Sequence, residues 1–248
     1  MPNPLGYRKL FAMVAPSVNT VVQPEFEALR PAGVTNHMGR INTPNVKIVT
    51  EADFVRHVEG MRSGIEAAID QVMTTRADYL IMALSLECFW DGLDASFRLE
   101  EDMQVRAGVG LTMGSTAILK SLETYGNIKR IALITPHRPL GDARVEAYFT
   151  EAGYEVTSLK SFNIQVPSEI ADITPEQLRD AIIEVNDDSV DAIVQVGTNL
   201  AMAETAARAE AWLDKPVIAI NTATYWYALR QNGIDDQMPG YGRLMSDY

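Results

Sequence analysis

The sequence predicts an α/β protein made of two similar doubly wound domains, related by a pseudo-twofold axis and each built on a parallel sheet. Two observations lead to this expectation. Short apolar runs alternate with amphipathic segments along the chain, which is the pattern of βαβ units. The chain also repeats itself weakly: residues 9–16 match 129–136, each an apolar run ending in proline, and residues 77–85 match 190–198.

The elements follow from these patterns in order along the chain. Apolar runs predict strands at about 9–15, 34–40, 79–84, 130–135, 155–162, 192–196 and 217–220. Amphipathic segments predict helices at about 21–29, 54–74, 115–124, 141–152, 175–186, 203–212 and 222–231. The start at 175 is well marked, because Thr174 suits an N-cap and Pro175 suits the first helical position.

The repeat predicts the domain organisation. The first half is expected to hold residues 1–113 with about 223–248, and the second half residues 114–222. Ser85 and Thr198 close the two matching apolar runs and therefore occupy equivalent positions. Ligands of open parallel sheets bind beyond the carboxyl ends of the strands, so we expect an active site in the cleft between the halves.

Composition excludes several classes of function. The 248 residues are 47% hydrophobic and carry a net charge of −12, which fits a globular protein and opposes binding to nucleic acid. No segment approaches the roughly 20 apolar residues of a membrane span, and no signal peptide is evident, so we expect a cytoplasmic protein without a membrane partner. One cysteine and three scattered histidines predict no metal site.

The loop at 15–20 follows the first predicted strand and enters a helix. Ser17, Asn19 and Thr20 place hydroxyl and amide groups beside backbone N–H groups there, and such a helix start suits a carboxylate. Capping of the helix by the same side chains is the alternative. Ser115 and Thr116 likewise open a helix after Gly114, where capping is favoured over ligand binding; no phosphate loop or dinucleotide fingerprint occurs.

The segment 85–92 concentrates chemistry at a strand end, with a hydroxyl, two carboxylates and the only thiol. Glu87 lies among apolar neighbours that would raise its pKa, which suits a general base near neutral pH. Cys88 is more simply read as a small buried hydrophobe, and Asp91 with Gly92 as a turn.

The matching loop in the second half is 197–200. Thr198 and Asn199 are expected opposite Ser85 and Glu87, where Asn199 could hold an oxyanion. His137 is the one histidine at a predicted strand end and is expected to line the cleft, whereas surface or packing roles are favoured for His37 and His57.

These motifs resemble a known family. Residues 15–20, Ala-Pro-Ser-Val-Asn-Thr, are similar to the first-strand motif of maleate cis-trans isomerases and arylmalonate decarboxylases, a branch of the aspartate/glutamate racemase superfamily. Residues 134–137, Ile-Thr-Pro-His, are similar to the second-domain motif. The resemblance covers nearly the whole chain and implies two flavodoxin-like halves, cofactor-independent catalysis, a small carboxylate or carbonyl substrate and a possible homo-oligomer.

The resemblance also implies roles for single residues. In members with two catalytic cysteines, one thiol from each half flanks the substrate, and those positions correspond here to Ser85 and Thr198. Asn19 matches a substrate-binding asparagine, and His137 stands where the family has tyrosine. Glu87 replaces a small hydroxyl donor to a substrate carboxylate, so it should repel a dicarboxylate.

Three functions remain open from the sequence. The first is an isomerase, racemase or decarboxylase working through an enediolate-like intermediate, with Glu87 as base or Cys88 turned into the cleft. The second is a hydrolase that opens a small cyclic amide, imide or lactone, with Glu87 activating water or Ser85. The third is a binding protein without catalysis. The first is ranked slightly above the second because the scaffold is recognised.

Overall fold

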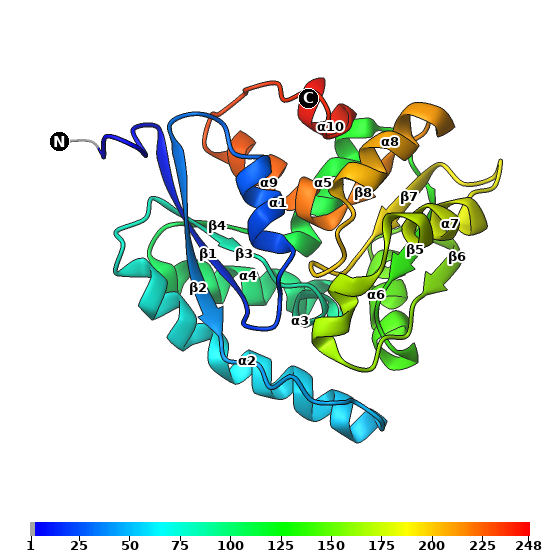
Figure 1. The fold of residues 1–248 in the computed structure, drawn as a ribbon, viewed down its shortest axis with the longest axis horizontal. Helices are drawn as coiled ribbons and strands as arrows, with labels where there is room; N and C mark the ends of the chain where they lie inside the picture. The colour runs from blue at the N-terminus through cyan, green and yellow to red at the C-terminus, as the bar shows by residue number, and fades with distance from the viewer. Residues whose placement is uncertain (1–2) are drawn as a thin grey trace.

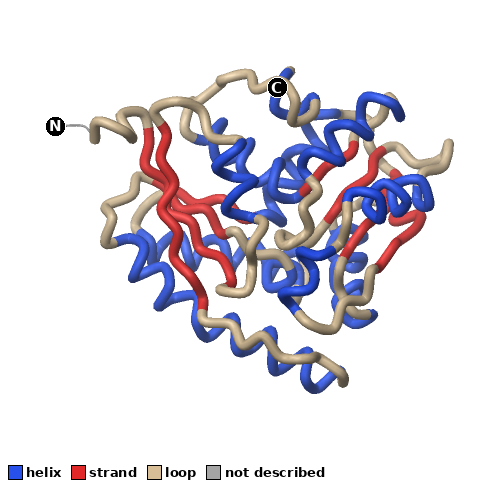
Figure 2. The backbone as a smooth tube through the Cα atoms, viewed as in Figure 1, coloured by secondary structure: helices blue, strands red, loops and turns tan. Residues whose placement is uncertain are grey.

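The computed structural model describes residues 3–248 and arranges their strands in two four-stranded parallel sheets (Figures 1 and 2). The first sheet has the order β2-β1-β3-β4 and the second the order β6-β5-β7-β8. The strands are β1 Lys9–Pro16, β2 Val34–Ile41, β3 Tyr79–Met82, β4 Gly110–Met113, β5 Arg130–Thr135, β6 Glu155–Ser161, β7 Ala192–Gln195 and β8 Val217–Ala219. The two orders are the same when each strand is matched with the one four places later, which confirms the predicted internal repeat.

Helices follow the strands and cover the sheets (Figure 2). They are α1 Val22–Ala28, α2 Glu51–Met73, α3 Leu86–Phe89, α4 Leu93–Ala107, α5 Gly114–Tyr125, α6 Pro139–Glu151, the 3-10 helix η1 Pro167–Asp172, α7 Pro175–Val185, α8 Ala203–Leu213, α9 Ile220–Gln231 and α10 Arg243–Ser246. Each predicted helix is present within a few residues of its expected bounds. The N-cap of α7 is confirmed, because Thr174 and Gln177 form reciprocal capping bonds.

The sequence analysis did not predict α4 and β4, which lie between β3 and α5, or the short helices α3, η1 and α10. Only Ser96 and Met103 are buried in the fifteen residues of α4, so the helix has little apolar periodicity. β4 has four residues and starts with glycine, which leaves too short a run to identify from the pattern. The sequence pattern therefore predicts a loop between β3 and α5.

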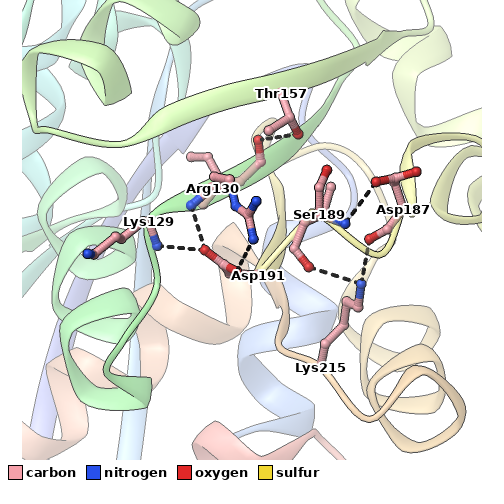
Figure 3. Close-up of polar contacts among 9 residues, drawn as sticks. Lys129, Arg130, Thr157, Asp187, Ser189, Asp191 and Lys215 are labelled. Atoms are coloured by element: carbon pink, nitrogen blue, oxygen red, sulfur yellow. Dashed lines mark hydrogen bonds and ion pairs between the residues drawn. The ribbon is translucent and has the colours of Figure 1, made fainter.

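Aspartates at equivalent positions hold the amino ends of neighbouring strands together in the two sheets. Asp78, just before β3, accepts the Leu10 N–H at 3.0 Å. Asp191, just before β7, accepts the N–H groups of Lys129 and Arg130 at 3.0 and 2.8 Å (Figure 3). Lys215 adds bonds to the carbonyls of Asp187 and Val190. These polar contacts lie at the amino ends of the strands, at the edge opposite the predicted site, and their role is structural.

Apolar packing joins the two halves. One core cluster includes Phe11 and Leu80 of the first sheet together with Leu133 and Val194 of the second. A smaller cluster under α7 and α8 serves the second sheet alone. Helix α9 packs along α5 and also touches β3, β4 and β8. The domain boundary inferred from the sequence stays a prediction.

Candidate active site

A cavity of about 100 Å³ lies beyond the carboxyl ends of the strands. Four strand-end loops meet there, at residues 16–19 after β1, 85–87 after β3, 136–138 after β5 and 197–199 after β7. Parallel strands bring such loops to one edge of a sheet, and the two edges face each other across the cavity. The site region is therefore the interdomain cleft that the fold class predicts.

The residues predicted for the site divide into two groups. Six line the cavity: Asn19, Ser85, Glu87, His137, Thr198 and Asn199. Four lie outside its lining: Ser17, Cys88, Ser115 and Thr116. The lining set comes from both halves, and each member lies within five residues of the end of a strand.

Two buried polar atoms in the cavity wall have no hydrogen-bond partner among the described residues. They are Ser85 Oγ, from the first half, and His137 Nε2, from the second. Their residues are only 7% and 9% exposed. A buried polar atom without a partner costs free energy, so these two atoms mark where polar groups of a bound molecule would be stabilised.

Asparagine side chains tie the two halves together at the cavity. Asn19 Nδ2 donates to Thr198 Oγ1 at 3.0 Å, and Asn19 Oδ1 accepts the N–H groups of Val21 and Val22 at the start of α1. Asn199 Oδ1 accepts the Thr20 N–H at 2.9 Å. Asn19 therefore caps a helix, as the simpler interpretation of the sequence expected, and also holds Thr198 in place.

Glu87 is the buried carboxyl of the site, with 3% of its surface exposed. Loss of water around the side chain raises its pKa, which backbone hydrogen bonds of Glu87 and Ser85 and the charge of Arg62 partly offset. Arg62 does not neutralise the carboxylate directly, because its guanidinium donates to the Glu87 carbonyl and pairs with Asp91 at 2.7 Å. Glu87 is thus suited to exchange a proton near neutral pH.

His137 lines the same cavity as Glu87, from the other half. Burial lowers the pKa of its imidazole to about 4, so the ring is neutral across the physiological range. The backbone is held by Ser161, whose hydroxyl donates to the His137 carbonyl at 2.6 Å. A neutral imidazole offers one donor and one acceptor, and it can bind a carbonyl or carboxylate oxygen without adding charge.

Cys88 points away from the cavity. It lies on the short helix α3, and its Sγ is 3.9 Å from Met113 Sδ inside the core. Burial and the nearby Glu87 carboxyl raise the pKa of the thiol well above its usual value. A thiol in such a place is inert, so this geometry favours the packing role over the chemical one.

The other three predicted residues also have partners elsewhere. Ser115 Oγ pairs with Ser96 Oγ at 2.9 Å, and Thr116 donates to the Glu100 carboxylate. Both lie in the first turn of α5, whose N-terminus has no side-chain cap. Ser17 is exposed and pairs with the backbone of Thr43. Neither capping by Ser115 and Thr116 nor their contact with the cavity is seen.

Helix α2 supplies a wall of the cavity that the sequence did not predict. Ile48, Phe54, His57 and Met61 line it, and Figure 1 shows α2 running along the edge of the molecule from the first half towards the second. The preceding loop is fixed to the second half by a bond from Ile48 N–H to the Gln165 carbonyl at 2.8 Å. The sequence favours a surface or packing role for His57, because its place on a helix gives no sign of which loops the helix faces.

The sequence also did not predict that Asn221 holds the backbone of Thr198. Asn221 Nδ2, at the start of α9, donates to the Thr198 carbonyl at 3.0 Å and to Glu25 at 2.6 Å. Glu25, on α1, also accepts the Ala203 N–H at the start of α8. Burial raises the pKa of Glu25 to about 7. The carboxyl thus links the first half to two helix starts of the second.

The chemistry of the site is that of carboxyl, hydroxyl, amide and imidazole groups. In residues 3–248 no cluster of three histidine, cysteine or acidic side chains could hold a metal ion. No helix in that range is long and apolar enough to cross a membrane.

Comparison with known proteins identifies the family. The family model described as arylmalonate decarboxylase matches residues 56–245. The chain belongs to the arylmalonate decarboxylase family. Its members are cofactor-independent enzymes of the racemase-like superfamily, which confirms the resemblance inferred from the sequence.

Similar proteins within and beside this family cover the whole chain. Maleate isomerases of Alcaligenes faecalis and Pseudomonas putida are 24% and 26% identical, over 94% of this chain and 94% and 95% of theirs. A solved maleate cis-trans isomerase of Nocardia farcinica, carrying a covalently bound succinylcysteine intermediate, superimposes with a TM-score of 0.87 at 20% identity, over 97% of this chain and 99% of that one. An arylmalonate decarboxylase structure gives a TM-score of 0.75 at 21% identity, over 95% and 98%. Members of the arylmalonate decarboxylase family thus share the two-sheet fold.

Proposed function

We propose that the protein is a cofactor-independent enzyme that transfers a proton at the carbon beside a carboxylate or carbonyl group of a small substrate, through an enediolate-like intermediate. Isomerisation, racemisation and decarboxylation all pass through this step. The observation that carries the proposal is the buried carboxyl of Glu87 in the cavity wall, with a raised pKa, in a chain of the arylmalonate decarboxylase family.

The proposed step divides the work between binding and proton transfer. The Ser85 and Thr198 hydroxyls and the neutral His137 ring hold the substrate oxygens from two sides. Ionised Glu87 removes the proton from the adjacent carbon, and the electron pair moves onto the bound oxygen to give the enediolate. The proton then returns to carbon. In a decarboxylation, carbon dioxide leaves first and the acid form of Glu87 supplies the proton.

Glu87 is a better acid and base for this step than the other groups of the cavity. The related Nocardia farcinica enzyme carries a covalent intermediate on cysteine, but the Cys88 thiol of this chain is buried beside Met113. Unperturbed serine and threonine hydroxyls do not ionise near pH 7. Burial raises the pKa of the Glu87 carboxyl above its usual value, which is the direction that favours acid–base catalysis at neutral pH.

A hydrolase is the second candidate, and one observation favours it. Ser85 Oγ has no hydrogen-bond partner in the described chain, so it could be activated by the adjacent Glu87 or could orient a water molecule. Asn19 and Thr198 would then stabilise the oxyanion. Asn199 is already engaged, because its Oδ1 accepts the Thr20 N–H and its Nδ2 donates to the Pro167 carbonyl.

Mass spectrometry of reactions in deuterated, oxygen-18-labelled water separates the two candidates. The panel contains small monocarboxylates, maleate, substituted malonates, amino-acid enantiomers, and cyclic imides and lactones. We expect carbon-bound deuterium without oxygen-18 in the product. Oxygen-18 in a ring-opened product would replace the proposal with hydrolysis, and absence of both labels across the panel would contradict both.

A further inference from the structure

The polar groups of the cavity are sufficient for one carboxylate or carbonyl group. Asn19 uses one N–H on Thr198 and its oxygen on the start of α1, which leaves one N–H of its amide. Thr198 accepts that bond and keeps its own proton to donate, and Ser85 Oγ has no partner in the described chain. These three donors can satisfy one carboxylate.

The charges of the wall oppose a second carboxylate. Arg138 is the one lysine or arginine among the described residues that line the cavity, and its guanidinium donates to the carbonyls of Ile48 and Val49 at 2.9 and 3.0 Å. Both histidines of the wall have a lowered pKa because of burial. A second carboxylate would therefore be buried near the Glu87 carboxyl, while the one cation of the wall is directed to backbone carbonyls, and such burial is costly.

The remaining wall is apolar. Ile48, Phe54, Met61, Ile164 and Ile170 line it, and Phe54 is held in place by Trp90, with ring centroids 5.6 Å apart. A cavity of about 100 Å³ has the volume of roughly three water molecules in the liquid. That space suits a compact aliphatic group next to the polar end.

Resting on the proposed function, we infer that the substrate is a small monocarboxylate, or a neutral carbonyl compound of the same size, with a compact apolar substituent, and that Glu87 discriminates against dicarboxylates. The proton transfer is then an isomerisation or racemisation of a compound with one acidic group. Dicarboxylates such as maleate and the malonates are excluded by charge, because their second carboxylate would be buried in the cavity that Glu87 lines.

Matched pairs of ligands test this inference without relying on turnover. Isothermal titration calorimetry at pH 7 would compare isocrotonate with maleate, and isobutyrate with methylmalonate; in each pair a methyl group replaces one carboxylate. We expect the wild-type chain to bind the monocarboxylate at least about tenfold more tightly, equivalent to roughly 1.4 kcal/mol. Equal or tighter binding of the dicarboxylates, or no binding of either monocarboxylate at millimolar concentration, would overturn the inference.

Two variants locate the discrimination. Glu87→Gln keeps the shape of the side chain and removes the acid, so we expect it to bind maleate about tenfold more tightly than the wild type and to reduce the preference. Glu100→Gln is the matched control, because Glu100 is a largely buried acid outside the cavity whose burial also raises its pKa. An unchanged preference in Glu87→Gln, with folding verified by circular dichroism, would remove Glu87 as the discriminating group.

Failure of the inferred ligand class and failure of the proposed function can be told apart. Tight binding of monocarboxylates without deuterium incorporation into any of them would contradict the proton-transfer chemistry and leave the ligand class intact. Deuterium incorporation into a dicarboxylate, together with tighter dicarboxylate binding, would support the proton-transfer chemistry and contradict the inferred ligand class.

Discussion

At the scale of single residues, the site depends on one buried carboxyl. Glu87 lies on the short helix α3, shortly after β3, and the fold brings it into a cavity wall where it is buried. Its partners hold the backbone and leave the carboxyl itself without a charged neighbour in direct contact, since Arg62 is directed to the Glu87 carbonyl and to Asp91. A raised pKa is the physical consequence.

Glu87→Gln should reduce turnover by about 100-fold or more, because a general acid–base group contributes roughly 10² to 10⁴ to the rate. The amide fills the same space, so the melting temperature should change little. Steady-state kinetics on the substrate found by isotope labelling, with thermal denaturation in parallel, gives both values. Wild-type turnover in a folded variant would defeat the assignment of Glu87 under either candidate function.

Cys88→Ala provides the opposite expectation one residue further along the chain. The thiol packs against Met113 in the core and does not line the cavity, so turnover should stay within about twofold of the wild type at a temperature where the variant is folded, while removal of the buried Sγ lowers stability by about 1 kcal/mol. Iodoacetamide should leave the native enzyme active. Loss of activity in both experiments would restore the thiol mechanism.

Six of the residues predicted for the site line the cavity. Their place could be predicted because each follows a predicted strand, and parallel strands bring their carboxyl ends together. Cys88 shows why the rest of the cavity lining could not be predicted correctly. It lies one position beyond Glu87 on a single helical turn, where neighbouring side chains point in different directions, and the pattern does not say which one faces the cleft. His57 and Asn221 needed the packing of α2 and α9, which only the three-dimensional arrangement supplies.

At the scale of elements, α1 acts as a connector between the halves. Its N-terminus is capped by Asn19, which reaches Thr198, and one turn later Glu25 reaches Asn221 and the start of α8. Asn221 in turn bonds the Thr198 carbonyl. The contacts form a closed set around Thr198, so the position of a cavity residue from the second half is set by a helix of the first.

The pKa of about 7 for Glu25 makes this connection dependent on pH. Below pH 4.5 the carboxyl is protonated in both states and has no effect. Between pH 4.5 and about 7 the unfolded chain releases the proton and the folded chain keeps it. This group therefore lowers the free energy of unfolding as pH rises, by roughly 3 kcal/mol in all. Above about pH 7 the loss is complete.

Glu25→Gln should remove this dependence. Relative to the wild type, its free energy of unfolding should rise by roughly 2 kcal/mol between pH 5 and pH 8, measured by urea unfolding at each pH. Glu27→Gln, on the same helix but 40% exposed in its side chain, serves as the control and should run parallel to the wild type. Parallel curves for Glu25→Gln as well would show that Glu25 titrates alike in the folded and unfolded states.

The elements themselves were largely predictable. The short helices α3, η1 and α10 have too few residues to show a helical period, and the absence of β4 and α4 from the prediction has a common cause. β4 and α4 do not carry a long apolar run or a clear apolar face, because β4 is a short edge strand and α4 lies with most of its surface in solvent. Strands and helices that bury a full face, such as β5 and α7, impose their periodicity on the sequence and were located within a few residues.

At the scale of the whole molecule, the repeat produces two sheets but not two independent cores. The larger apolar cluster contains residues of both sheets, such as Phe11 and Leu133. Hydrogen bonds between Asn19 and Thr198 and between Asn199 and Thr20 cross the cavity as well. A shared core makes the opening of one half costly for the other, and we expect the chain to unfold as one cooperative unit.

Ile182→Ala tests this coupling from the far side of the second half. Ile182 lies fully buried on α7 in the cluster that serves the second sheet alone, and loss of its side chain should cost about 2 to 5 kcal/mol. Native-state hydrogen exchange then reports on each sheet separately. In a cooperative molecule, the most protected amides of β1 and of β5 lose the same free energy of protection.

The neighbouring Ile183→Ala, at a side chain 53% exposed, changes the same chemical group on the same helix and should leave both sheets near wild-type protection. Amides of β1 that keep wild-type protection in Ile182→Ala, while those of β5 lose it, would show that the halves open separately and that the cavity between them is bounded by two independent units.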